Sequence, residues 1–258
     1  HGRLMPAAPG AVPAGWDCHV HVFDAQAPVA TGHYRPPPAA LDTIESLAAA
    51  SGIGHLVLVQ PSVYGTDNSL LLDTLRRRPG RHRGVAVVDA ATTPRMLASM
   101  HDAGVRGVRF NLVSPVGNGE EALDALAPAL KALGWHVQWY AKAADLPRIA
   151  SLQRRHGLRF VLDHYASMPA DGSAPAAAWD ALQALAEGGA WVKLRDRSPR
   201  VLLWADNMAR APHWNSKRAL GFFTRRGSSS TKNCRVISAA SPSFMISSSV
   251  SSASRFTN

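Results

Sequence analysis

Two histidines separated by one residue, His19 and His21, lie near the end of a short apolar segment of residues 15–24. The segment has the length of one buried β-strand, and side chains two residues apart on a strand point to the same face. The two imidazoles therefore project together, an arrangement that suits a metal site. In a barrel of parallel strands this face can be the interior, near the C-terminal mouth where such enzymes carry out their chemistry.

Other polar side chains follow later apolar segments in the same way. They are Ser62, Arg109, Asn111, Tyr140, Asp163 and His164. Taken alone, each has a structural explanation, such as a helix cap, a surface ion pair or a satisfied core hydroxyl. The C-terminal ends of parallel barrel strands meet on one rim, and surface residues would have no reason to share it. We therefore interpret these residues as one candidate site.

Short apolar segments alternate with amphipathic helical segments along most of the chain, which is typical of βαβ units around a parallel sheet. After the first strand, the pattern predicts strands over 55–60, 84–88, 105–110, 135–140, 159–163 and 190–194, and helices over 39–51, 67–78, 94–103, 120–133, 145–156 and 176–187. Seven repeats with short loops favour a (β/α)8 TIM barrel, an α/β fold, over an open doubly wound sheet. No Gly-x-Gly-x-x-Gly fingerprint follows the first strand, which argues against a dinucleotide site.

The repeat breaks after residue 194. Only residues 195–200 precede the next apolar segment, 201–204, whereas a crossover between parallel strands needs a dozen residues or more. Fourteen serines lie between Arg197 and Asn258, without helical periodicity. We predict a flexible leader over 1–13, a barrel domain over 14–215 that is incomplete or distorted after its seventh strand, and a Ser-rich basic tail over 216–258 that is disordered or non-native. A frameshift in the coding sequence would produce such a break.

The basic charge is concentrated in this tail. Residues 1–196 carry 18 Lys and Arg against 17 Asp and Glu, whereas residues 197–258 carry 10 basic residues and one acid. The balanced body argues against a dedicated nucleic-acid surface. The sequence has no apolar segment of membrane-spanning length, and its two distant cysteines form no disulfide framework. We therefore expect a cytoplasmic protein without a membrane or nucleic-acid partner, and the oligomeric state stays open.

Four segments resemble the amidohydrolase superfamily, in the branch of 2-pyrone-4,6-dicarboxylate hydrolase and related lactonases. They are residues 16–23 (Trp-Asp-Cys-His-Val-His-Val-Phe), residues 60–68 (Gln-Pro-Ser-Val-Tyr-Gly-Thr-Asp-Asn), residues 104–111 (Gly-Val-Arg-Gly-Val-Arg-Phe-Asn) and Asp163-His164. The similarity covers residues 14–194, and the second segment is its most specific part. The resemblance implies a metal-independent hydrolysis of a lactone that carries carboxylates.

The resemblance also implies roles for single residues. His19, His21 and His164 would surround the lactone carbonyl and stabilise the developing oxyanion, while an aspartate that ends the eighth strand would activate water as a general base. Asp206 is the candidate for that base. Tyr34, Ser62, Arg109 and Tyr140 would bind the carboxylates of a small anionic substrate, and Arg109 can grip one in a bidentate fork.

Two departures from the family pattern bear on the activity. The segment after Arg109, residues 112–116, lacks the second arginine expected of a pyrone-dicarboxylate enzyme, so the substrate can differ. Asp206 is one residue out of step with the usual strand-eight motif. Activity can therefore be impaired, and a catalytically impaired anion-binding protein is one alternative.

A metal-dependent decarboxylase is the other alternative. His19, His21 and His164 could bind a divalent metal such as Zn²⁺ and leave a fourth position open. Metal-dependent relatives usually add a ligand on the fourth or fifth strand, where this sequence has Arg109 and Tyr140. The sequence therefore favours a site that requires no cofactor.

Overall fold

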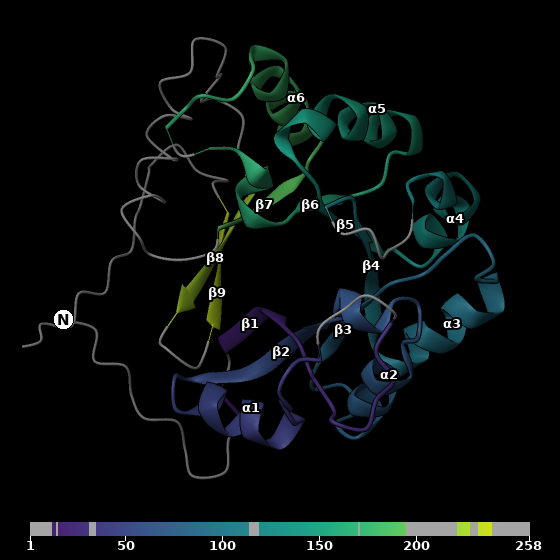
Figure 1. The fold of residues 1–258 in the computed structure, drawn as a ribbon, viewed down its shortest axis with the longest axis vertical. Helices are drawn as coiled ribbons and strands as arrows, with labels where there is room; N and C mark the ends of the chain where they lie inside the picture. Colours follow the sequence, from purple (N-terminus) through teal and green to yellow (C-terminus); the bar gives the residue numbers. More distant parts are fainter. Residues whose placement is uncertain are drawn as a thin grey trace, which may run out of the picture.

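The computed structural model describes residues 12–13, 15–30, 35–113, 119–169, 171–194, 221–227 and 232–238. Its nine strands form one sheet in the order β1 to β9, with parallel pairing from β1 to β8 and an antiparallel β8–β9 pair. The sheet curls until β8 and β9 come next to β1, and the helices cover its outer face (Figure 1). The fold is therefore an α/β barrel, as predicted.

The elements follow one another in strict alternation up to the seventh strand. They are β1 (Gly15–Val20), α1 (Leu41–Ala49), β2 (Ile53–Val59), α2 (Ser69–Arg76), β3 (Arg83–Ala86), α3 (Pro94–Ala103), β4 (Val105–Asn111), α4 (Glu121–Ala132), β5 (His136–Tyr140), α5 (Leu146–His156), β6 (Phe160–Leu162), α6 (Ala176–Glu187) and β7 (Trp191–Leu194). Short 3-10 turns, η1 (Ser62–Tyr64), η2 (Ala143–Asp145) and η3 (His164–Ser167), follow β2, β5 and β6. Among the described residues, no helix is both long and apolar enough to cross a membrane.

Local sequence signals explain why these helices begin and end where they do. Pro94 opens α3, and the Thr93 side chain accepts a hydrogen bond from the Met96 N–H, which satisfies one of the unpaired amides of the first turn. Gly157 ends α5 with a left-handed φ of 60°. At α2 the predicted start was two residues early: the helix begins at Ser69, whose N–H donates to Asp67 Oδ1.

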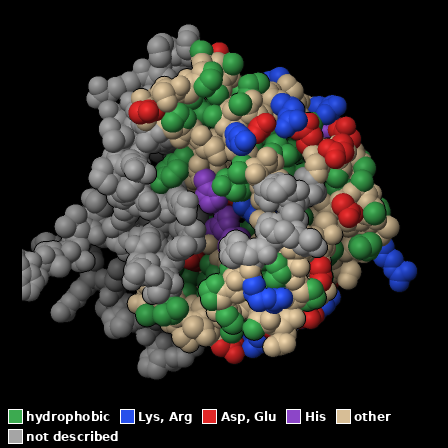
Figure 2. Space-filling model, viewed as in Figure 1, with side chains coloured by type: hydrophobic (Ala, Val, Ile, Leu, Met, Phe, Trp, Pro, Cys, Tyr) green, Lys and Arg blue, Asp and Glu red, His purple; other side chains and the backbone are tan. Residues whose placement is uncertain are grey.

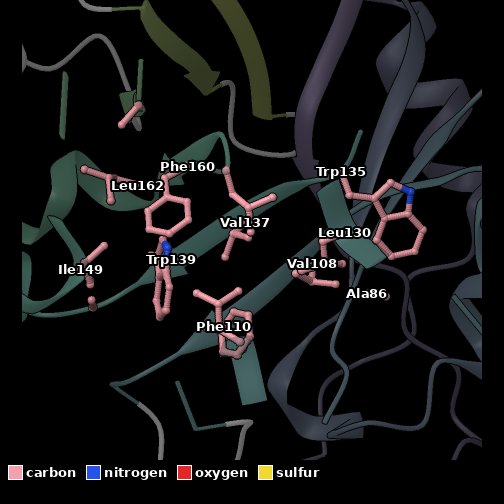
Figure 3. Packing of buried hydrophobic residues seen from close by; sticks show 14 of the residues in the cluster. Ala86, Val108, Phe110, Leu130, Trp135, Val137, Trp139, Ile149, Phe160 and Leu162 are labelled. Atoms are coloured by element: carbon pink, nitrogen blue, oxygen red, sulfur yellow. The ribbon is translucent and has the colours of Figure 1, made fainter. Parts of the chain in front are cut away.

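Alternation along each strand separates a polar interior from an apolar outer layer. On β4, Val108 and Phe110 point outward into the core between sheet and helices, whereas Arg109 lies in the intervening position and faces inward. Figure 3 shows the outer layer. There the Phe110 and Trp139 rings stack with centroids 4.9 Å apart, and the Phe160 ring centroid lies 5.5 Å from that of Trp139. Truncating one such aromatic side chain typically costs ~3–5 kcal/mol, so this layer contributes to the stability of the sheet.

Two strands lie within the segment 216–258, which is predicted to be a disordered or non-native tail. They are β8 (Gly221–Gly227) and β9 (Lys232–Ser238). β8 continues the parallel sheet from β7, and β9 turns back antiparallel to β8, so the parallel pairing of the sheet ends at β8. The apolar segment 201–204 lies outside the described residues, and the domain boundaries stay predictions.

Candidate active site

The candidate site lies on the inner face of the sheet, toward the C-terminal ends of the strands. His19 on β1, Arg109 on β4, Tyr140 on β5 and the pair Asp163-His164 after β6 all contact at least one other member of the set. Histidine side chains gather at the centre of the view in Figure 2, inside the ring of strands seen in Figure 1. The structure thus brings these predicted residues together.

Asp163 is 1% exposed and contacts several other residues of the site. Its Oδ2 accepts hydrogen bonds from Arg109 Nε at 3.2 Å and Gln138 Nε2 at 2.9 Å. Its Oδ1 lies 3.4 Å from Lys193 Nζ and 3.5 Å from His19 Nδ1. Burial alone would raise the pKa of Asp163, but the charge of Lys193, with His19 and Arg109, holds it well below the usual value. The carboxylate is therefore ionised at neutral pH.

The rings of His21 and His164 both lie near the ring of His19. The His19 and His21 rings are nearly perpendicular with centroids 4.9 Å apart, and the His164 ring centroid lies 5.9 Å from that of His19. His21 Nδ1 donates to the Val59 carbonyl at 2.8 Å, because a carbonyl can only accept. Burial, followed by the charge of Lys193, lowers the pKa of His19 well below its usual value, so His19 is neutral at pH 7.

His164 is aimed by an uncommon backbone turn. Four consecutive non-glycine residues, His164 to Ser167, have positive φ values between 51° and 59°. The left-handed conformation costs roughly 1–2 kcal/mol for each such residue. Strain of this kind persists where surrounding contacts enforce it, and it concentrates at functional sites. Here the turn directs the His164 ring against Tyr140, at a centroid distance of 4.7 Å.

The predicted substrate-binding residues fall into two neighbouring groups. The Arg109 guanidinium lies over the Tyr140 ring, with Cζ 5.4 Å from the centroid. Within the described part of the chain, Arg109 Nε donates a hydrogen bond to Asp163, whereas Arg109 Nη1 and Nη2 make none. Ser62 Oγ accepts from Asn111 Nδ2 at 3.4 Å, and Asn111 pairs in register with Tyr140 across β4 and β5. The two groups are therefore continuous across one sheet edge.

Sequence reasoning missed two residues of this cluster, Gln138 and Lys193. Gln138 is fully buried, donates to Asp163 Oδ2 and accepts from Lys193 Nζ at 2.7 Å. Both could have been found from strand alternation. Gln138 lies two residues before Tyr140 and opposite Arg109 in register, and Lys193 is the one charged side chain in the apolar segment 190–194.

Two predicted site residues, Tyr34 and Asp206, lie outside the described residues. Their roles in substrate binding and in activating water stay predictions.

The alternative metal set, His19, His21 and His164, stays a prediction. Lys193 Nζ lies 3.4 Å from both His19 Nδ1 and Asp163 Oδ1, so an ammonium takes the place in which a cation would meet these two groups. Among the described residues, no three His, Cys, Asp or Glu side chains converge as a ligand set. His136 begins β5, at the opposite end of the strand from Tyr140, and burial lowers its pKa to about 4.

Comparison with known proteins agrees with this architecture. A family model described as amidohydrolase matches residues 16–218. The 2-pyrone-4,6-dicarboxylate hydrolase of Comamonas testosteroni is 35% identical over 159 residues, which are 59% of this chain and 52% of that protein. The 4-sulfomuconolactone hydrolase of Rhizobium radiobacter is 30% identical over 162 residues, 60% of this chain and 54% of that protein. The chain therefore spans about half the length of the curated relatives it matches.

Solved structures with a similar fold were also found. A putative 2-pyrone-4,6-dicarboxylic acid hydrolase from Pseudomonas putida has a TM-score of 0.65 and 29% identity, covering 83% of this chain and 81% of that one. A probable hydrolase of the same acid from Acinetobacter baumannii also has a TM-score of 0.65, at 23% identity, with 76% and 77% covered. Because the family model matches well over half of the chain, the protein belongs to the amidohydrolase family.

Proposed function

We propose that this chain hydrolyses lactones that carry carboxylate groups, through attack of water on the ring ester carbonyl. The observation that carries the proposal is the buried cluster of His19, Arg109, Asp163 and Lys193 at the centre of an amidohydrolase barrel. The names of two relatives, a pyrone-dicarboxylate hydrolase and a sulfomuconolactone hydrolase, support the substrate class, because both describe hydrolases of anionic lactones.

The charge balance of the cluster favours an anionic substrate. Arg109 and Lys193 are basic side chains that share the single carboxylate of Asp163, while His19 is neutral. Among the described residues, one of these two basic groups therefore has no carboxylate of its own. A buried charge of this kind is costly without a partner, and a substrate carboxylate supplies one. The Nη1–Nη2 edge of Arg109 presents the fork geometry that binds a carboxylate at two points.

The reaction balances without an additional reactant. The oxygen of water bonds to the ring carbonyl carbon, and the negative charge that develops on the carbonyl oxygen is stabilised by the histidine cluster. The ring C–O bond then breaks, giving a carboxylate and a hydroxyl group with release of one proton. A carboxylate general base takes the proton from the attacking water, and Asp206 is the residue that we propose for this role.

Replacing Arg109 by lysine is expected to raise KM for a carboxylate-bearing lactone about 10–100-fold, because a charge-assisted fork is worth roughly 1.5–3 kcal/mol. The comparison uses 2-pyrone-4,6-dicarboxylate and a pyrone ester without free carboxylates. Arg95→Lys, on the exposed face of α3, is the matched control. An equal rise in KM for the uncharged ester would show that Arg109 does not recognise a carboxylate.

We further propose that this hydrolysis requires no metal, which separates it from the decarboxylase alternative on the same barrel. Purified protein is expected to contain less than one equivalent of any divalent metal and to keep its lactonase rate after chelation and dialysis. Elemental analysis and assays before and after the chelator provide the measurement. Loss of the rate together with its recovery on adding Zn²⁺, or release of CO2 in place of ring opening, would favour the decarboxylase.

A further inference from the structure

Lys193 is a buried lysine whose ammonium has two hydrogen-bond acceptors and one carboxylate beside it. It lies on β7 and is 8% exposed, a position in which an unpaired charge would be costly. Its Nζ lies 2.7 Å from Gln138 Oε1, 3.4 Å from His19 Nδ1 and 3.4 Å from Asp163 Oδ1. An ammonium has three N–H donors and accepts nothing, so its two hydrogen-bonded partners, Gln138 Oε1 and His19 Nδ1, must both act as acceptors.

The orientation of Gln138 supports a charged Lys193. The Gln138 amide nitrogen must face Asp163 Oδ2, because an ionised carboxylate only accepts hydrogen bonds. Its Oε1 is thereby turned toward Lys193, where it needs a donor. The chain Lys193–Gln138–Asp163 therefore has a single consistent direction of donation, which begins at the ammonium and ends on the carboxylate.

Two neighbours compete to set the proton position on the neutral His19 ring. Asp163 Oδ1, at 3.5 Å, would favour a proton on Nδ1, whereas Lys193, at 3.4 Å, requires a lone pair there. With a proton on Nδ1, an N–H of the buried Lys193 ammonium would face another N–H in place of an acceptor. Asp163 Oδ1 has no hydrogen-bond partner among the described residues, so its contact with His19 Nδ1 lacks hydrogen-bond geometry, whereas Lys193 Nζ is in hydrogen-bonding position to that nitrogen. The requirement of Lys193 therefore decides the tautomer.

We propose that Lys193 is a positioning residue that holds the proton of neutral His19 on Nε2, so that His19 donates a hydrogen bond to the lactone carbonyl oxygen. The use of this N–H in catalysis rests on the proposed function, whereas the tautomer does not. His19 then polarises the carbonyl and cannot serve as the base that takes a proton from water. The base must be another group, which agrees with a carboxylate in that role.

Nitrogen NMR of the full 258-residue chain, uniformly labelled with ¹⁵N, tests the tautomer directly. The His19 signals are assigned from their absence in His19→Gln. In the wild-type protein, Nε2 is expected to give the protonated shift and Nδ1 the unprotonated shift. In Lys193→Met the proton is expected to move to Nδ1, facing Asp163. Lys131→Met, on the exposed end of α4, removes a lysine elsewhere and is expected to leave the pattern unchanged.

Kinetics of the same variants give a second readout. Lys193→Met is expected to lower kcat for lactone opening about 10²–10³-fold, the usual effect of losing one oxyanion donor, with a much smaller change in KM. A wild-type spectrum with the proton on Nδ1, or a tautomer unchanged in folded Lys193→Met, would overturn the proposal even if the protein is an active lactonase. If Lys193→Met does not fold, the wild-type spectrum alone decides. If no lactone is opened, the proposed function fails and the spectra still test the role of Lys193.

Discussion

Replacing His19 by asparagine is expected to lower kcat for opening a carboxylate-bearing lactone about 10²–10³-fold, with KM changed much less. His19 is neutral and buried at the centre of the histidine cluster, so its ring N–H acts on the charge that develops in the transition state. Asparagine is shorter than histidine and cannot reach the same point from the β1 backbone. Substrate binding is maintained because Arg109, rather than His19, is proposed to hold the carboxylate.

The matched control for this variant is His156→Asn. His156 ends α5 in the outer layer, where Nε2 pairs with Asp124 Oδ1 at 2.8 Å. Its replacement removes a histidine without reaching the barrel interior, so steady-state rates are expected to stay at the wild-type level. A His19→Asn protein that is folded by circular dichroism and retains the wild-type kcat would show that the role assigned to His19 is wrong.

The second large effect is expected on stability. Asp163→Asn should lower the free energy of unfolding by about 3–5 kcal/mol, because it leaves Arg109 and Lys193 buried without their shared counter-charge. Urea denaturation is the measurement, with a lower midpoint at an unchanged m-value. Asp180→Asn, on the exposed face of α6, is the matched control. The double variant Asp163→Asn/Lys193→Met should recover part of the loss, because one unpaired cation is removed.

The effect of Asp163 has a defined pH dependence. Its pKa is held well below 3.8 in the folded state, so the unfolded state takes up the proton first as the pH falls. The stabilisation is complete above the unfolded pKa, about 3.9, and is lost as the pH falls below it toward the folded value. Wild-type and Asp163→Asn stabilities should therefore differ at pH 7 and converge only in acid. Equal stabilities at pH 7 would contradict the ion-pair assignment.

The barrel frame could be predicted from the sequence because each parallel strand is buried on both faces and appears as a short apolar segment. The helix over 94–103 was predicted with its observed bounds, since a proline at its start and a glycine after its end fix both. The same signals placed Arg109, Tyr140 and Asp163 at strand ends. Chemistry-bearing residues were therefore found wherever a polar side chain ends an apolar segment.

Other parts of the site could not be found in that way. Gln138 and Lys193 lie within strands. A single polar residue among apolar neighbours does not change the prediction of a buried strand, so it gives no separate signal of a functional role. The left-handed turn at 164–167 contains no glycine, so nothing local predicts its positive φ values. It is enforced by tertiary contacts such as the one between His164 and Tyr140. The β8–β9 pair lies in a segment that has neither helical nor strand periodicity.

The central claim is that this cluster opens a lactone by attack of water on the ring carbonyl. Its most direct test is to incubate the full chain with 2-pyrone-4,6-dicarboxylate in H₂¹⁸O and analyse the product by mass spectrometry, with calorimetry of binding in parallel. The predicted result is one ¹⁸O atom in the newly formed carboxylate for each ring opened, with one proton released. Tight binding of the dicarboxylate by the folded protein without any ring opening would contradict the claim and identify an anion-binding protein.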